Sequence, residues 1–371
     1  SGAINIRTVA PDPGTPNAFV ELTAGDLGLQ RLSAAGNIRL SDNAAIRATV
    51  FSSQRDGYVD NYTYDFNAPF IGVENDVFNN RDRWGARVQL AYDNDDDFNL
   101  RLILDYAEID EVCCAGISRI DSLFAQNALL QGNVANGSDA ARSFFLFNTT
   151  FTNFPYEGIV GPLPPTVIQG VTFEDYVTAQ DILPVSQNED QGISLEMNKS
   201  FDNGVTLTSV SAFRAFDTYD YIDVDFTDTA LAERYNDASQ HSFSQELRFA
   251  GEFGERSNWV AGAYYFQQTV KSNTRTTGGN DFPAYVFLVE PELTAFYETL
   301  VGANVPVTLP APAGMFADDI VNQDQDGYAV FGQIDWALGE TLTATLGARY
   351  TNETKKIDTI YTQTHNAGEP N

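Results

Sequence analysis

The chain is organised in stretches of about ten residues in which apolar and polar side chains alternate. In the segment 341–350, Leu342, Leu346 and Tyr350 share one face with two alanines. Arg349 and three threonines share the other face. Because successive side chains of a β-strand point to opposite faces, this period of two predicts a strand with different surroundings on its two sides.

Further segments repeat the pattern with charged or amide side chains at mid-strand. The apolar stripe comprises Val88, Leu90, Leu100, Leu102, Leu104, Leu342 and Leu346. The opposite stripe comprises Arg87, Gln89, Arg101, Gln333 and Arg349. Charges at mid-strand are tolerated in a wet lumen and are costly against lipid. We therefore expect the first stripe to face lipid and the second to face the lumen of a barrel.

About eleven strands are predicted in this way. They cover residues 17–26, 29–41, 43–55, 82–93, 97–110, 190–201, 204–218, 238–253, 258–272, 327–337 and 341–357. One set of connections is short and rich in Asn, Asp and Gly, which favour tight hairpins: 41–43, 93–97, 202–204, 254–256 and 338–340. Apart from the tight turn 26–28, the other set is long: 56–81, 111–189, 219–237, 273–326 and 358 onward.

Sorting short turns to one rim and long loops to the other is typical of outer-membrane barrels. A soluble sandwich has no reason to sort its connections in this way. The predicted fold class is therefore all-β, a transmembrane antiparallel β-barrel with short periplasmic turns and long extracellular loops. We expect the longest loop, 111–189, to fold over the barrel mouth, because plain coil of that length is uncommon.

Composition excludes several classes of protein. The net charge of -30, from 51 acidic and 21 basic residues, argues against nucleic-acid binding. No apolar run approaches the roughly 18 residues of a membrane helix. The sequence shows no Gly-rich phosphate loop, metal-ligand cluster or nucleophile with a plausible base, so we expect neither enzymatic activity nor a cofactor.

Aromatic side chains in the predicted extracellular loops are the candidate ligand contacts. They are Tyr58, Tyr62, Tyr64, Tyr219 and Tyr221. Such rings can stack on a sugar or on a siderophore ring. The alternative is that they pack within the loops or anchor the barrel at the membrane interface.

Three aspartates form a weak candidate metal site. Asp223, Asp225 and Asp228 have a loosely calcium-like spacing, but no Gly-containing calcium loop follows them. The alternative is that the three aspartates belong to a solvated, acidic rim. Because no calcium loop follows them, we expect no bound metal.

Cys113 and Cys114 are the only cysteines, and they are adjacent. Three interpretations stay open: a disulfide between them, bridges to cysteines outside this sequence, or two free thiols. A metal site is disfavoured because the only histidines, His241 and His365, belong to other segments.

Several segments resemble TonB-dependent outer-membrane receptors. Residues 1–8, Ser-Gly-Ala-Ile-Asn-Ile-Arg-Thr, resemble the end of the plug domain in that family, where Gly-Gly-Ala-Ile-Asn-Ile-x-Thr leads into the first barrel strand. Ser1 stands where the family has its first glycine. The prolines within 11–16 suit the plug-to-barrel linker, 328–351 looks like the family's mid-barrel hairpin, and 204–214 is also typical of the family.

The resemblance implies a larger protein. Such transporters have about 22 strands around a plugged lumen. Residues 1–12 are then the last strand of the plug and the linker, and 13–371 are the N-terminal half of the barrel. We expect most of the plug and the other half of the barrel outside this sequence. The implied partners are outer-membrane lipid and lipopolysaccharide, TonB acting through the preceding region, and the remaining half-barrel.

The resemblance implies an active transporter in the outer membrane of a Gram-negative bacterium. Such a receptor binds a scarce solute at the cell surface, such as a siderophore, vitamin, saccharide or peptide, and imports it to the periplasm. The alternatives are a passive porin-like channel and a structural or adhesive surface barrel. Porins lack a plug, so residues 1–8 argue against the passive channel.

Overall fold

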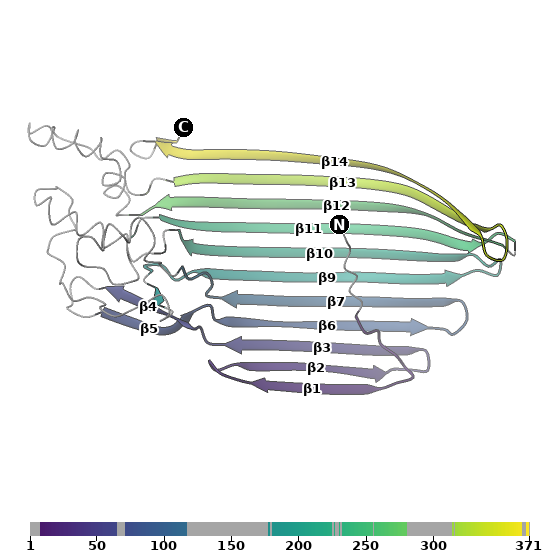
Figure 1. The fold of residues 1–371 in the computed structure, drawn as a ribbon, viewed down its shortest axis with the longest axis horizontal. Helices are drawn as coiled ribbons and strands as arrows, with labels where there is room; N and C mark the ends of the chain where they lie inside the picture. The colour runs from purple at the N-terminus through teal and green to yellow at the C-terminus, as the bar shows by residue number, and fades with distance from the viewer. Residues whose placement is uncertain are drawn as a thin grey trace, which may run out of the picture.

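Eleven long antiparallel strands lie side by side in sequence order and form one open sheet (Figure 1). The computed structural model describes residues 8–64, 71–116, 177–178, 180–224, 226, 230, 232–254, 256–279, 314, 316–365 and 369–370. A twelfth strand, β15 (Glu369–Pro370), adds two residues beside the last long strand.

The long strands follow the predicted segments in order. They are β1 (Asn17–Ala24), β2 (Gln30–Arg39), β3 (Ala44–Arg55), β6 (Arg81–Asp93), β7 (Phe98–Glu111), β9 (Val185–Ser200), β10 (Thr206–Asp223), β11 (Ala232–Glu252), β12 (Ser257–Gly278), β13 (Phe316–Ala337) and β14 (Thr343–His365). Each pairs with the next, and β1 and β14 lie at opposite edges of the sheet (Figure 1). The predicted all-β, antiparallel architecture is confirmed.

The sheet has one apolar and one polar face. Val88 lies opposite Leu104, which lies opposite Ile193 on the next strand, and this row belongs to what we call the apolar face. Arg87 lies opposite Asp105 in the same strand pair. Because these residues adjoin Val88 and Leu104, they point to the other side, which we call the polar face. The predicted alternation is confirmed.

Within the described part of the chain, the apolar face remains exposed. Leu346, Tyr350 and Trp336 are 74%, 58% and 56% exposed. The buried hydrophobic residues of the long strands are all alanines. A soluble domain would pack a second layer against such a face. An apolar surface of this extent instead indicates contact with a membrane or another protein.

Tight turns join the strands at one end of the sheet, which we call the turn end. They lie between β2 and β3, β6 and β7, β9 and β10, β11 and β12, and β13 and β14. Gly204, with φ of 79°, and Gly254, with φ of 66°, supply left-handed backbone that glycine adopts without a steric penalty. Asp95 has φ of 60°, which a short polar side chain tolerates. The predicted short turns are confirmed.

The opposite end, which we call the loop end, differs from the prediction. The loops predicted at 219–237 and 273–326 are wrong in extent, because β10 to β13 continue into both ranges. Many side chains on the apolar-face side of these extensions are polar. For example, Lys271 lies opposite Asn322, which lies opposite Asp358. Because polar side chains interrupt the apolar face there, the hydrophobic alternation is too weak to identify these extensions from the sequence.

The long connection predicted at 56–81 is present between β3 and β6, but it contains two strands of a second, small sheet that the sequence pattern did not predict. Its strands are β4 (Val59–Tyr64), β5 (Ile71–Phe78) and β8 (Val177–Thr178), in the order β5-β4-β8. Val59 and Phe78 lie opposite each other and are fully buried. Most of the predicted loop 111–189 lies outside the described residues, and so does its expected fold over the barrel mouth. Among the described residues, no helix is long and apolar enough to cross a membrane.

Candidate functional site

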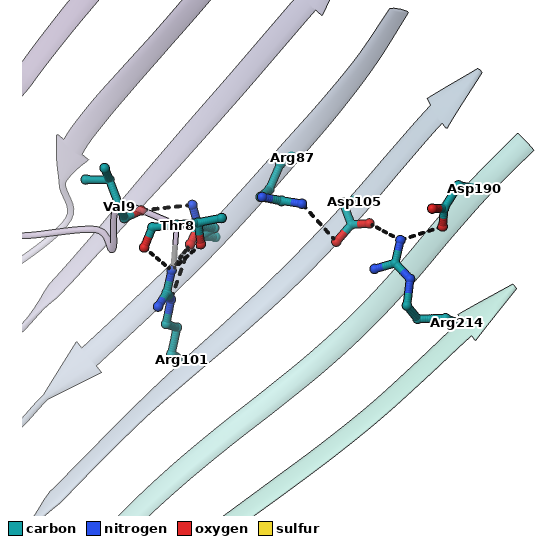
Figure 2. A network of polar contacts seen from close by, with 8 residues as sticks. Thr8, Val9, Arg87, Arg101, Asp105, Asp190 and Arg214 are labelled. Atoms are coloured by element: carbon teal, nitrogen blue, oxygen red, sulfur yellow. Dashed lines mark hydrogen bonds and ion pairs between the residues drawn. The ribbon is translucent and has the colours of Figure 1, made fainter. Parts of the chain in front are cut away.

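Four charged side chains form a line across the polar face (Figure 2). Arg87 of β6 places Nη2 3.8 Å from Oδ1 of Asp105 on β7. Arg214 of β10 places Nη2 3.1 Å from the other oxygen of Asp105 and also pairs with Asp190 of β9. The Asp105 side chain is only 15% exposed. We call these four residues the charged row, because they link four neighbouring strands through one shared carboxylate.

A glycine makes room for the charged row. Arg214 lies opposite Gly192 of β9, and Gly192 lies opposite Asp105 of β7. A Cβ at Gly192 would lie 2.7 Å from Nη1 and 3.1 Å from Cζ of Arg214. Because Gly192 has no side chain, the Arg214 guanidinium extends across β9 and reaches Asp105 of β7.

The charged row crosses the boundary between β7 and β9, where no short connection fixes the register of the two strands. β7 and β9 are joined through residues 112–184, so no tight turn sets their register. Leu102 lies opposite Leu195 on the apolar face, while Asp105 and Gly192 meet on the polar face. A slip of one residue would exchange the two faces. Side-chain pairing therefore specifies this register.

The chain segment before β1 lies on the polar face, across several strands (Figures 1 and 2). We call residues 8–16 the strap. Arg101 donates from Nη2 to the carbonyl and hydroxyl oxygens of Thr8, at 3.2 and 2.8 Å. Gln89 donates from Nε2 to the Val9 carbonyl at 3.1 Å, and its own carbonyl accepts from Arg101 Nε at 3.2 Å. Gln89 is 2% exposed, so the strap covers it.

A second group of contacts holds the other end of the strap. Asn37 of β2 donates from Nδ2 to the carbonyls of Asp12 and Thr15, at 2.7 and 3.0 Å. Its Oδ1 accepts from the Asp12 N–H at 3.1 Å. Arg47 of β3 donates to the side chain of Asn17 at 3.3 Å. These contacts mainly recognise the main chain of the strap, so they depend little on its sequence.

Further polar pairs lie at the loop end of the strands. Arg275 of β12 donates from Nε and Nη2 to the two carboxylate oxygens of Asp318 on β13, each at 2.5 Å. Its Cζ lies 4.5 Å from the ring centroid of Phe316. Hydrogen bonding from Arg275 lowers the pKa of Asp318. Burial raises the pKa of Tyr221, and so does the Glu233 carboxylate, which accepts a hydrogen bond from the Tyr221 hydroxyl.

The structure separates the predicted ligand tyrosines. Tyr219 and Tyr221 share the apolar-face side of β10, above Phe213, and Tyr219 is 39% exposed. Tyr58 lies between β3 and β4, with Arg55 Cζ 5.3 Å from its ring centroid. Because β6, β7 and β9 lie between β3 and β10, Tyr58 is not adjacent to Tyr219 and Tyr221 in the sheet. Tyr62 and Tyr64 lie in β4, and their side chains are outside the described residues. Ligand contact by these tyrosines stays a prediction.

The predicted metal-site and cysteine residues lie at the loop end of the sheet. Asp223 is fully buried, and its Oδ1 accepts from the Phe226 N–H at 3.0 Å. Asp225 and Asp228 are outside the described residues. Within the described ranges, no group of three or more His, Cys, Asp and Glu side chains could hold a metal ion. Cys113 and Cys114, just after β7, are joined as a disulfide.

Sequence reasoning assigned Arg87, Gln89, Arg101 and Arg214 to strands but missed what they contact. Asp105 and Arg214 are more than one hundred residues apart, and the connection between their strands gives no register signal. Gln89 and Arg101 meet a strap about 80 to 93 residues away in sequence. The one available signal was Gly192 in the middle of a strand, which indicates close approach of another group.

Similarity to known proteins is found in the structure and not in the sequence. No protein-family model and no curated protein matches this sequence. The ferric yersiniabactin uptake receptor FyuA from Yersinia pestis is similar in structure, with a TM-score of 0.57 at 12% identity over 98% of this chain and 42% of that chain. The alcaligin outer-membrane receptor FauA from Bordetella pertussis gives 0.48 at 10% identity, over 98% and 40%. The siderophore receptor PiuA from Acinetobacter baumannii gives 0.45 at 13% identity, over 96% and 48%.

The chain shares its fold with part of FyuA. The likeness to FyuA carries this statement, and at 12% identity it concerns the fold alone. The predicted resemblance to the barrels of TonB-dependent receptors is confirmed at that level. The chain spans 42% of the length of FyuA.

Adding a side chain at Gly192 should uncouple the charged row. In Gly192→Ala, the new Cβ displaces the Arg214 guanidinium from Asp105, and we expect a loss of about 1 kcal/mol, because the Arg214 side chain is half-exposed and solvent screens its charge. A double-mutant cycle with Arg214→Met and Asp105→Asn should give a coupling energy in the parent that vanishes in Gly192→Ala. Gly347→Ala is the matched control, since its Cβ would lie 3.6 Å from the nearest atom. An unchanged coupling energy would refute this role of Gly192.

The Arg275–Asp318 pair should weaken in acid. Because hydrogen bonding from Arg275 holds the pKa of Asp318 below the ordinary value of about 3.9 for an aspartate, Asp318 contributes stability above about pH 4, and that stability is lost as the pH falls through the lowered pKa. Hydrogen exchange at the loop ends of β12 and β13, corrected for the intrinsic rate, should then accelerate. Asp318→Asn should remove this pH dependence. Equal dependence in parent and variant would contradict it.

Proposed function

We propose that this chain forms part of the wall of a TonB-dependent outer-membrane transporter. Such a transporter captures a scarce solute at the surface of a Gram-negative cell and admits it to the periplasm. Residues 1–12 are assigned to the end of the plug and its linker, and 13–371 to the barrel. The wall itself carries out no covalent chemistry, and the proposal calls for no cofactor.

The strap is the observation that carries the proposal. A water-filled channel needs a polar inner face but no chain segment lying across it. Here Gln89 and Asn37 are buried beneath the strap and direct their amide groups at its main chain. This supports a barrel whose lumen receives a domain that precedes the first strand, and it favours an active transporter over a porin-like channel.

The apolar face supports the assignment to a membrane. On β12 it runs from Trp259 to Tyr265, with aromatic side chains at both ends. Beyond Tyr265 the same face carries Thr269 and Lys271. A tilted strand crosses a bilayer in about 9–11 residues. About half of this 22-residue strand is therefore available to extend beyond the lipid on the loop side.

The other partners follow from this assignment. Lipid and lipopolysaccharide cover the apolar face, TonB engages the region before the strap, and further strands complete the barrel. For the solute we propose a metal-loaded siderophore as the first class to test, because FyuA is by name a ferric yersiniabactin uptake receptor. Cobalamin, oligosaccharides and peptides are the other classes. A structural or adhesive barrel is the remaining alternative, and the strap gives it no support.

A charge on the apolar face should be costly if that face meets lipid. Leu102→Arg should lower the free energy of unfolding by about 2–4 kcal/mol, the cost of arginine near the bilayer midplane. Reversible denaturant unfolding in lipid vesicles measures this cost. Gln333→Arg, on the polar face, is the control and should change stability by less than about 1 kcal/mol. Equal costs at the two positions would contradict lipid contact.

Conductance and uptake together test the transporter assignment. The native protein, purified and placed in a planar bilayer, should show no steady porin-like conductance, because the lumen is occupied. Cells should take up ⁵⁵Fe supplied as catecholate or hydroxamate chelates, or else labelled cobalamin or malto-oligosaccharide, only while TonB is present. Open conductance with TonB-independent uptake would establish the passive channel instead. A closed barrel with no uptake of any of these probes would favour the structural alternative.

A further inference from the structure

Four arginines gather around one serine on three neighbouring strands, β2, β3 and β6 (Figure 1). Arg31 of β2 lies opposite Ser53 of β3, and Ser53 lies opposite Arg83 of β6. Two residues nearer the loop end, Arg55 of β3 lies opposite Arg81 of β6. Directly opposite residues have Cβ atoms about 4.5–5.5 Å apart, so these side chains share a small area of the sheet. We call the five residues the arginine patch.

The arginine patch lies on the polar face, between the strap and the loop end. Arg83 is an even number of residues away from both Arg87 and Gln89, so its side chain points to the same face as theirs. Gln89 holds the strap, and at 3.4 Å per residue Arg83 lies about 20 Å beyond it toward the loop end. Within the described residues, the strap makes no hydrogen bond to the patch.

The protein itself does not balance the charge of the patch. The sequence has 51 acidic residues against 21 basic ones, and Arg214 elsewhere on the polar face pairs with carboxylates. In the patch, Arg83 does the same, with Nε and Nη2 each 2.7 Å from an oxygen of Glu111. In the part of the chain that the structure describes, Arg31 and Arg81 form no ion pair.

Like charges also face each other across β3 and β6. Arg55 and Arg81 are directly opposite, which destabilises a pair of strands. Arg55 donates from Nε to the Asp56 carbonyl at 3.3 Å, and its Cζ lies 5.3 Å from the ring centroid of Tyr58. These partners carry no negative charge at the contacting atoms. An anion bound at the patch would therefore relieve a repulsion that the described contacts leave in place.

Three buried polar atoms at or beside the patch have no hydrogen-bond partner in the described part of the chain. Ser53 is 6% exposed, and its Oγ is one of these atoms. The others are Nε of Arg81 and Nε of the adjoining Arg87. Such atoms are uncommon, because a buried group without a hydrogen bond keeps its full desolvation cost. A hydroxyl and two guanidinium N–H groups all donate, so carboxylate or phosphate oxygens suit them together.

An exposed aromatic ring borders the patch on the side of the strap. Phe51 of β3 lies opposite Gly85 of β6 and is 42% exposed, and a Cβ at Gly85 would lie 2.7 Å from its ring. Phe331 has the same relation to Gly262, but Arg349 covers its ring with Cζ 5.7 Å from the centroid. Within the described ranges no arginine covers Phe51 in this way, so its ring is free to pack against a flat group.

We propose that the arginine patch binds a carboxylate or phosphate group of a ligand that also carries a flat ring. Arg31 and Arg81 neutralise the anionic group, Ser53 donates a hydrogen bond to one of its oxygens, and Phe51 packs against the ring. Arg83 stays paired with Glu111. The proposal rests on the proposed function only for the side of the membrane from which the ligand enters.

Binding of small aromatic anions to the full-length protein in detergent tests the patch. Phenyl phosphate and phthalate are the probes, and calorimetric titration gives the Kd of each. At least one of them should bind ten times more tightly than benzamide, which has the ring without the charge. The tighter of the two distinguishes a phosphate from a carboxylate ligand. Binding of both probes no tighter than that of benzamide would overturn the proposal.

A charge-matched pair of variants separates the patch from general attraction to positive charge. Arg31→Met with Arg81→Met should weaken the preferred probe at least tenfold. Arg248→Met with Arg349→Met removes the same charge from another part of the polar face and should change Kd less than twofold. Equal losses in the two double variants would overturn the proposal.

Ser53 and Phe51 give independent readouts. Ser53→Ala should weaken the preferred probe about tenfold, the loss expected for a hydrogen bond to a charged group. Phe51→Ala should weaken phenyl phosphate or phthalate but leave the Kd of inorganic phosphate unchanged. If the double arginine variant does not fold, the single variants Arg31→Met and Ser53→Ala decide. Unchanged affinity in both of them would overturn the proposal.

The two proposals fail separately. A protein that binds the probes at the patch but imports no solute would keep the anion site and refute the transporter. TonB-dependent uptake by a protein that binds neither probe would keep the transporter and refute the anion site.

Discussion

Every structural feature of this chain depends on the unbroken ladder of main-chain hydrogen bonds between neighbouring strands. In lipid an unpaired N–H or C=O group costs several kcal/mol, so only closed, fully paired sheets span a membrane. Pairing here continues without a gap from β1 to β14. Among the described residues, β1 pairs on one side only, and β14 gains only β15 on its far side. A barrel built from this sheet therefore requires additional strands at both edges.

The ladder also explains why register matters so much. Once two strands are paired, the alternation of side chains decides which residues face each way. Between most strands a tight turn fixes the pairing, but β7 and β9 depend on their own side chains. The shared carboxylate of Asp105 and the space above Gly192 act there on the polar face. Leu100, Leu102 and Leu104 of β7, which lie opposite apolar residues of β9, act on the apolar face. The same alternation that separates the two faces thus also aligns the strands.

Much of the sheet could be predicted from the sequence where its two faces differ. β6 and β7 match the predicted segments to within one residue, because leucines and arginines alternate along them. The loop-end segments of β11 to β14 extend beyond the predicted ranges, by six residues in β11 and eleven in β13, because the many polar side chains there weaken the periodic signal. The strands of the small sheet were missed because β4 and β5 are short and lie within a range assigned to a loop.

The candidate site was less predictable than the fold. The sequence placed Arg87 and Arg101 on the correct face, but their partners come from strands and a strap far away along the chain. Such contacts require the register to be known first. The tyrosines were chosen because they lie in predicted loops, whereas Tyr219 and Tyr221 turned out to belong to β10. Residue type suggested a role, but the geometry that would test it depends on strands whose extent the sequence did not reveal.

The central claim is that one face of this sheet meets lipid and the other a wet, partly filled lumen. A spin-label scan along β7 in the membrane-embedded protein, with Cys113 and Cys114 replaced by serine, tests it most directly. We predict that labels at Leu100, Leu102 and Leu104 are accessible to molecular oxygen, whereas labels at Ile103 and Asp105 are accessible to an aqueous nickel complex, in strict alternation. Labels at the three leucine positions that are shielded from oxygen, or as accessible to nickel as their neighbours, would contradict the account.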